Sequence, residues 1–154
     1  MACQLLYGTA RQKDGTLSRR PNTESGFAAT PHDWVLSGPH FFLANPFNKT
    51  PRNVCTANGH YDIIDLPTLP DDYLPRTNYR PMPDRAEYLR RTPRVSWLEP
   101  GETQGRPVTE FFRLVNREMI GSSSERTLIT TLMPPGAAHI NTLLAHSFQD
   151  SREL

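Results

Sequence analysis

Hydrophobic and polar residues alternate most regularly in the last third of the chain. From Glu110 to Ile120 the sequence reads EFFRLVNREMI, so every second residue shares one face of an extended segment. Residues 127–133, TLITTLM, are rich in β-branched side chains and follow the polar stretch GSSSER. These features predict a β-hairpin with a polar tip, which the sequence PPG ends.

Weaker patterns predict the remaining elements. Residues 84–91, DRAEYLRR, are the one plausible helix, because Asp84 can cap its start and Pro93 stops it. Residues 139–148, HINTLLAHSF, are ambiguous between strand and short helix. Other short strands are expected at 34–36 and 41–43, around a Gly38-Pro39 turn, and at 61–66, and Ala2 to Tyr7 could add an edge strand.

Residues 67–83, PTLPDDYLPRTNYRPMP, are dense in proline. Proline removes backbone donors and forbids a long helix, so an extended surface loop is expected here. The loop carries Tyr73, Arg76, Tyr79 and Arg80. It could be a simple connector, but long irregular loops inside a compact unit are more often functional.

These elements predict an α+β fold, mostly antiparallel strands and hairpins with one short helix and long proline-rich loops. Residues 1–30 are polar and weakly patterned, which predicts a poorly ordered N-terminal segment. Residues 31–154 are expected to form the ordered domain of the chain.

Composition narrows the function classes. No apolar run approaches the roughly 20 residues that span a bilayer, and the residues at the N-terminus are not expected to act as a secretory signal. The two cysteines, Cys3 and Cys55, exclude a disulfide framework and a four-cysteine zinc site. We therefore expect reduced thiols in a cytoplasmic protein that has no membrane partner.

The net charge of only +1 excludes a basic nucleic-acid arm. The identity of the basic residues is more informative than this net charge. Of the 17 Lys and Arg residues, only Lys13 and Lys49 are lysine. Arginine makes planar, bidentate contacts with carboxylates, phosphates and guanine edges. A GC-rich genome would also produce this bias.

Catalytic motifs are missing. The sequence has no glycine-rich cofactor loop, no phosphate-binding P-loop, no zinc HExxH and no GxSxG. His60 and Asp62 with His32 could ligate a metal, and Cys55 with His60 could form a nucleophile and base, although surface histidines with ordinary partners explain them as well. We expect no catalytic residue, metal or cofactor in this chain.

Side chains suited to nucleic acid gather in the proline-rich loop and the hairpin. Phosphates are bound by Arg, Ser, Thr and Asn, and base edges are read by Arg, Asn and Gln on a rigid element. Arg113 and Arg117 are four residues apart on a predicted strand and so share a face. Either could instead pair with Glu110 or Glu118.

Three stretches, within about residues 34–148, resemble one region of a known family. They are LSGPHFFLANPFNKTPR, YDIIDLPTLPDDYLPRTNYRP and FFRLVNREMIGSSSERTLITTLMPPGAAHINTL. They look like the region downstream of the catalytic domain in large bacterial N6-adenine DNA methyltransferases, the Eco57I-like and type IIG restriction-modification proteins and related anti-phage methylases. The pattern R-L-x-x-R-x-M followed by S-x-E-R-T-L-I is fairly specific.

The resemblance implies that residues 31–154 form a partial target-recognition-like domain, a fragment of a larger protein. Its partners would be double-stranded DNA and the methyltransferase catalytic domain of that parent protein. The family's glycine-rich S-adenosylmethionine loop is not in this sequence, and NPF at 45–47 lacks the second proline of the Asn-Pro-Pro-Tyr type motif. S-adenosylmethionine is therefore expected only in the parent protein, and whether this chain is itself an enzyme stays open. The recurring positions of the resemblance are Pro75, Arg76, Thr77, Asn78, Tyr79, Arg113, Arg117, Glu125, Arg126, Thr127 and His139.

We therefore predict a DNA-recognition segment of an adenine-specific methyltransferase, with a protein-interaction or scaffold module as the alternative. Recognition predicts that the arginines of the loop and hairpin cluster on one exposed face, whereas the interaction module predicts that they face acidic residues. A third hypothesis, a small independent enzyme, predicts that His32, His60 and Asp62 converge in a pocket. The predicted DNA contacts are Arg76, Asn78, Tyr79, Arg80, Arg113, Arg117, Arg126 and Thr127.

Overall fold

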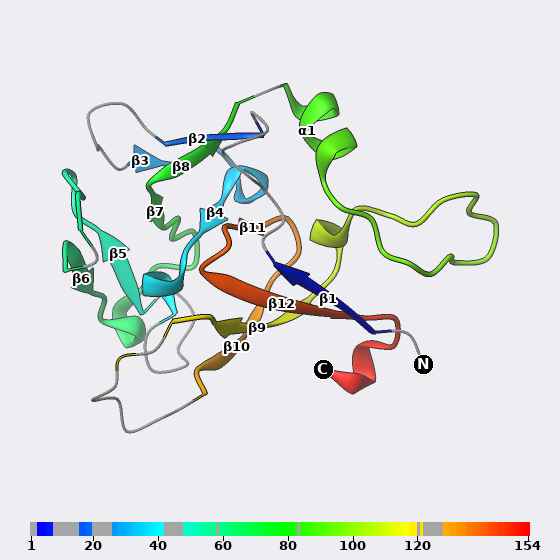
Figure 1. Ribbon diagram of the computed structural model, residues 1–154. Helices are drawn as coiled ribbons and strands as arrows, with labels where there is room; N and C mark the ends of the chain where they lie inside the picture. The colour runs from blue at the N-terminus through cyan, green and yellow to red at the C-terminus, as the bar shows by residue number, and fades with distance from the viewer. Residues whose placement is uncertain are drawn as a thin grey trace.

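The computed structural model describes residues 3–7, 16–19, 26–41, 48–57, 59–82, 84–119, 121 and 128–154. The fold is α+β, as predicted, and consists mainly of short antiparallel strands (Figure 1). One four-stranded sheet forms the largest element, and the other strands pair two by two. Across the described residues, no helix has the length and apolar content that a bilayer span requires.

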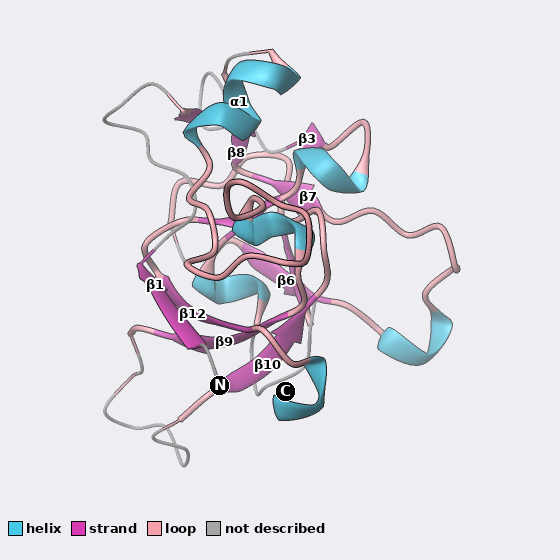
Figure 2. Cartoon of the chain, turned by 90° about the vertical axis from the view of Figure 1, so that its right-hand side faces the viewer, coloured by secondary structure: helices cyan, strands magenta, loops and turns pink. Residues whose placement is uncertain are grey.

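The four-stranded sheet contains the predicted hairpin. Its strand order is β1 (Cys3–Tyr7), β12 (Leu143–Phe148), β9 (Arg113–Arg117), β10 (Thr130–Met133), and every neighbouring pair is antiparallel. The strands lie side by side in both views of the molecule (Figures 1 and 2). The ambiguous segment is thus strand at β12, and β1 adds the edge strand that the sequence allowed.

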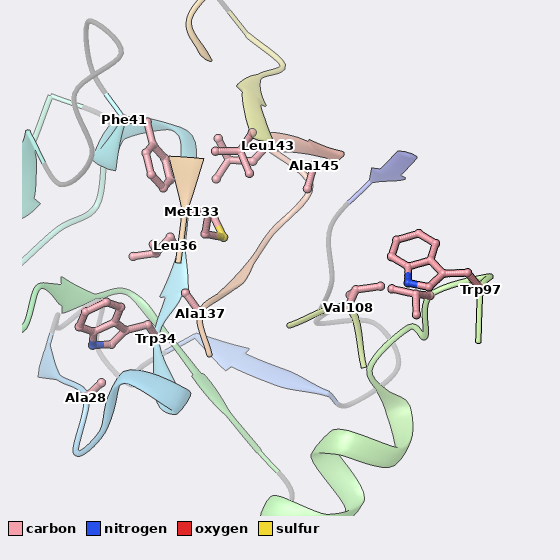
Figure 3. Close-up of a cluster of buried hydrophobic side chains, with 12 residues drawn as sticks. Ala28, Trp34, Leu36, Phe41, Trp97, Val108, Met133, Ala137, Leu143 and Ala145 are labelled. Atoms are coloured by element: carbon pink, nitrogen blue, oxygen red, sulfur yellow. The ribbon is translucent and has the colours of Figure 1, made fainter. Parts of the chain in front are cut away.

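Alternation along these strands decides which side chains face the core. Val115, Met133, Leu143 and Ala145 are all buried, and the residue next to each along its strand is more exposed. They pack in one cluster with Leu36 and with other apolar side chains from the loops (Figure 3). Further members of the cluster include Trp34, Phe41, Trp97, Val108 and Ala137.

The remaining strands are very short because prolines and turns interrupt them. The parallel pair β4 (Val35–Leu36) and β11 (Ala138–His139) joins the first quarter of the chain to its C-terminal part. The antiparallel pairs are β2 (Leu17–Arg19) with β8 (Tyr79–Pro81), β3 (Gly26–Phe27) with β7 (Arg76–Thr77), and β5 (Lys49–Pro51) with β6 (Tyr61–Ile63).

The proline-rich segment is extended, as predicted, but it also contributes β7 and β8 to two of these pairs. Their partners β2 and β3 come from within residues 1–30, where the sequence predicts little order. Pairing with distant segments therefore provides regular structure in a stretch that has no clear pattern of its own. The proposed division of the chain at residue 30 stays a prediction.

The helix α1 (Arg85–Arg91) forms where its capping and stop signals predict. The Asp84 carboxylate accepts a hydrogen bond from the Glu87 backbone N–H at 3.0 Å. The Gly38-Pro39 turn, however, begins a 3₁₀ helix over Gly38–His40 instead of separating two strands, and residues 42–47 lie outside the described residues. Other 3₁₀ turns cover Pro31–Asp33, Leu66–Thr68, Val108–Glu110 and Ser151–Glu153.

Candidate nucleic-acid interface

Arg113, a predicted DNA contact, lies entirely in the core. Its side chain is 0% exposed and donates hydrogen bonds to the backbone oxygens of Phe111 and Pro134, each at 3.4 Å, and of Ala137. Burial lowers the pKa of the guanidinium to about 10. Odd-numbered residues of β9 face the core, so the Arg113 side chain is buried. It donates to backbone carbonyls of nearby loops and does not present its donors to DNA in this fold.

Arg117 shares that face of β9, as predicted, but lies at the end of the strand and is only partly buried. Burial lowers its pKa, and its Nε has no hydrogen-bond partner within the part of the chain that the structure describes. Glu110 pairs with Arg106, at 3.7 Å, and not with either strand arginine. The predicted contacts Arg126 and Thr127, together with Glu125, lie outside the described residues.

The four predicted contacts of the proline-rich loop have different surroundings. Arg76 is partly exposed and Arg80 is exposed, whereas Asn78 is buried and its amide nitrogen lies 2.8 Å from the Tyr61 hydroxyl. Tyr79 is half-buried against a small apolar cluster. Because Arg113 is buried, the described arginines of the loop and the hairpin do not form one exposed face, although Arg80 is exposed and Arg76 lies beside a surface groove.

Arg76 lies beside an exposed aromatic ring. Its guanidinium carbon is 4.9 Å from the centre of the Phe27 ring, and the Phe27 side chain is 58% exposed. The pairing of β3 with β7 places Phe27 directly opposite Arg76, which explains why the two side chains meet. Such a cation–π contact orients the guanidinium above the ring. Among the described residues, Arg76 forms no ion pair.

Arg76 and Phe27 line a surface groove of about 390 Å³. The β5–β6 ribbon supplies the opposite wall, where Arg52 Nε lies 2.8 Å from the Asp62 carboxylate. The groove thus combines two arginines, an aromatic face and hydrogen-bonding groups, which are the side-chain types that bind phosphates and base edges. Its other lining residues are Thr50, Pro51, Asn53 and Tyr73.

The sequence reasoning missed Phe27, Arg52 and Asn53 as site residues. Phe27 falls in the stretch predicted to be poorly ordered, and its role depends on a strand pair formed across some fifty residues. Arg52 and Asn53 follow Pro51 in a segment that carried no chemical motif. An Arg-Asn dipeptide in a polar loop was the only local signal that could have pointed to them.

The enzyme hypothesis gains no geometric support. Within the described residues, no group of three His, Cys, Asp or Glu side chains could hold a metal ion. Asp62 pairs with Arg52, His60 Nδ1 accepts from the Thr56 backbone N–H at 3.2 Å, and neither histidine of the predicted trio lines the groove. Asp62 and His60 are therefore engaged with other partners, and no described pocket brings these two residues together with His32.

Comparison of the chain with protein-family models, curated proteins and solved structures gave no match. The resemblance to the recognition region of adenine methyltransferases therefore rests on the sequence patterns alone.

Proposed function

We propose that this chain is the DNA-recognition segment of an adenine-specific DNA methyltransferase in a restriction-modification or phage-defence system. It acts in the cytoplasm by binding double-stranded DNA and not by catalysis. The methyltransferase catalytic domain and its S-adenosylmethionine belong to the parent protein. The observation that supports this proposal most is the groove in which Arg76 lies over the exposed Phe27 ring.

The Arg76–Phe27 pair suits contact with a phosphate or a guanine edge. The cation–π contact with the ring does not use the N–H groups of the guanidinium as hydrogen-bond donors, so they can donate two parallel hydrogen bonds to a ligand. Stacking also restricts the long side chain before any ligand arrives, which reduces the entropy lost on binding. The groove therefore offers a preoriented arginine at an accessible surface.

The rest of the groove limits how strongly DNA can bind. Asp62 neutralises part of the charge of Arg52 and would repel a phosphate, although a carboxylate can also accept from the amino group of cytosine. With a net charge of only +1 on the chain, few phosphates can be neutralised. We expect modest affinity that depends on a small number of contacts.

The test is fluorescence anisotropy of the purified chain with a mixed-sequence DNA duplex at several salt concentrations. The logarithm of the affinity should fall linearly with the logarithm of the salt concentration. Arg76→Ala should weaken binding and make this slope shallower by about 0.9. Arg152→Ala, which removes an exposed arginine paired with Asp150 outside the groove, is the matched control and should change neither quantity.

Two results would count against this proposal. The first is no binding at about 20 mM salt by a chain that circular dichroism shows to be folded. The second is an equal effect of Arg76→Ala and Arg152→Ala, which would mean that the interaction is a general attraction and does not involve the groove.

The interaction module remains the second candidate because the outer face of the four-stranded sheet exposes apolar side chains. Leu132 of β10 is 45% exposed and lies opposite Leu114 of β9, and Phe112 just before β9 is 52% exposed. Apolar patches on a sheet face often mark protein contacts. If this face binds a partner protein, sedimentation velocity of the chain mixed with that protein should show a complex. Leu132→Asp should remove the complex, whereas Ile63→Asp, at a 71% exposed position on β6, should not.

A further inference from the structure

A second pocket, of about 230 Å³, lies on the other side of the β5–β6 ribbon from the groove. Tyr61 lines this pocket and its neighbour Asp62 lines the groove, since successive side chains of β6 point to opposite faces. Segments far apart in the chain meet here: Ser37, Cys55, Tyr61, Asn78 and Thr142 all contribute. The described residues that line the pocket include no charged side chain.

A chain of hydrogen bonds holds the polar wall of this pocket in place. Asn78 Nδ2 lies 2.8 Å from the Tyr61 hydroxyl, which is 3.2 Å from Ser37 Oγ, which in turn is 3.2 Å from His40 Nδ1. His40 Nδ1 also accepts from the Ser37 backbone N–H, so Nε2 carries the proton and donates to the Arg76 backbone oxygen at 3.0 Å. Burial lowers the pKa of His40, which keeps the ring neutral.

The neutral imidazole of His40 determines which group donates and which accepts at every step of this series of hydrogen bonds. Because His40 Nδ1 accepts, Ser37 can donate to it, the Tyr61 hydroxyl can donate to Ser37, and Asn78 donates to the Tyr61 oxygen. The four side chains are all more than nine-tenths buried. The pocket wall is thus preorganised before any ligand binds.

Asn78 leaves one polar atom without a partner. Cys55 Sγ donates to the Ala57 backbone oxygen at 3.7 Å, so the thiol accepts from Asn78 Nδ2, at 3.4 Å. This contact and the one to Tyr61 occupy both amide hydrogens and fix which end of the amide is Oδ1. Within the described part of the chain, that buried oxygen has no hydrogen-bond donor. Buried amide oxygens normally have one, so the missing donor calls for an explanation.

We propose that this pocket binds an uncharged, nucleobase-sized ring that bears an amino or N–H group, which donates to Asn78 Oδ1. The absence of charged lining residues disfavours an ion, because a charge taken out of water needs a compensating partner. The partly apolar lining, which includes Ile140 and Pro39, suits the faces of a flat ring. The proposal does not depend on DNA binding in the groove.

Two sources could supply such a ring, a free small molecule or an unpaired base of a nucleic acid. The second is geometrically reasonable because Asn78 is two residues from Arg76 of the groove, and the Arg76 carbonyl accepts from His40 of the hydrogen-bonded chain. Both sources share the same recognition chemistry, so the experiment has to separate them.

The test follows the Asn78 side-chain amide signal by NMR, in the absence of duplex DNA. 9-Methyladenine, whose only N–H donor is its amino group, should shift this signal saturably. The N6,N6-dimethyl derivative of the same compound lacks that donor and should bind at least about tenfold more weakly. Single-stranded oligo(dA) that moves the same signal and competes with 9-methyladenine would identify an unpaired base as the source, and binding of the free compound alone would identify a small molecule.

Variants locate the binding site. Asn78→Leu should weaken 9-methyladenine binding about tenfold or more, measured by calorimetry, whereas Asn141→Leu, at an exposed position beside the pocket that does not line it, should not. If Asn78→Leu does not fold, Ala57→Trp at an exposed position of the rim should abolish binding by filling the pocket. Equal binding of the two adenine compounds, no binding of either, or unchanged affinity in folded Ala57→Trp would overturn the proposal.

Discussion

Arg113 and Arg76 show how differently two regions of this chain use the same side chain. Arg113 lies in the core face of the four-stranded sheet, where its Nε and Nη2 donate to the backbone oxygens of Phe111, Pro134 and Ala137, while Nη1 has no partner among the described residues. Arg76 lies in the region of short strand pairs, where its guanidinium rests on an exposed ring at the edge of a groove. The sequence pattern alone treats both as equal candidates for DNA contact.

The two regions differ in which groups provide the hydrogen-bond partners of their backbone N–H and C=O groups. The carbonyls of Pro134, in the PPG turn after β10, and of Ala137, just after it, accept hydrogen bonds from the buried Arg113. In the other region, strand pairs satisfy the backbone locally and leave Arg76 available for a ligand. A buried arginine is thus a structural element here, and only a partly exposed one can recognise an external group.

The largest expected effect is a loss of stability, and it distinguishes the structural role of Arg113 from the binding role of Arg76. Arg113→Ala should lower the free energy of unfolding by about 4 kcal/mol, because buried carbonyls lose their donor and a cavity remains. Arg76→Ala should lower it by less than about 1 kcal/mol, since its side chain is partly exposed. Urea denaturation followed by circular dichroism measures both. Equal losses in the two variants would show that the comparison is mistaken.

The second-largest expected effect is a decrease in the free energy of unfolding on acidification, caused by His139 near Arg113. Burial, helped by the charge of Arg113, lowers the pKa of His139 to about 3, whereas the unfolded chain takes up that proton near pH 6.5. The stabilisation is therefore complete above about pH 6.5 and is lost progressively as the pH falls toward 3. At pH 5 the loss from this residue should be about 2 kcal/mol.

The matched variant for this prediction is His139→Gln, which removes the titrating ring. The decrease in unfolding free energy between neutral pH and pH 5 should be smaller in the variant than in the natural chain. An identical pH dependence would mean that His139 has the same pKa in the folded and the unfolded protein, so that burial does not lower it.

Local signals in the sequence predict the regular elements well. The helix over residues 85–91 follows from Asp84 and the flanking prolines, and the β9–β10 hairpin follows from alternation of its residues. Alternation also shows that Arg113 and Arg117 share a face, but it does not show that the face is the buried one. That depends on packing against segments such as Leu36, which are distant in the sequence.

The candidate groove could not be predicted for the same reason. Arg76 was identified from its loop, but its partner Phe27 reaches it only through the pairing of β3 with β7. Asn78 appeared equivalent to Arg76 in the sequence, yet the turn between β7 and β8 directs it toward buried Tyr61 and not toward the surface. Strand pairs of two residues leave no periodic signal.

Removing the ring beneath Arg76 should have an intermediate effect, and it should fall on binding. Phe27→Ala should weaken DNA affinity about five- to tenfold, through loss of the cation–π contact and of a stacking surface. Stability should change by less than about 1 kcal/mol, because the ring is 58% exposed. Leu98→Ala, at a 52% exposed position outside the groove, is the control for both measurements. A loss of stability without a loss of affinity would make Phe27 a packing residue.

The smallest expected effect concerns the acidic wall of the groove. Asp62→Asn breaks the ion pair with Arg52, but both side chains are more than half exposed, so the free energy of unfolding should change by less than about 0.5 kcal/mol. DNA affinity should rise about threefold at low salt, since a carboxylate that repels phosphates is removed, and the gain should shrink as salt screens the charge. Asp150→Asn breaks a comparable pair outside the groove and should leave affinity unchanged. A decrease in affinity confined to particular duplex sequences would instead mean that Asp62 accepts from a base, and the groove would then read sequence as well as charge.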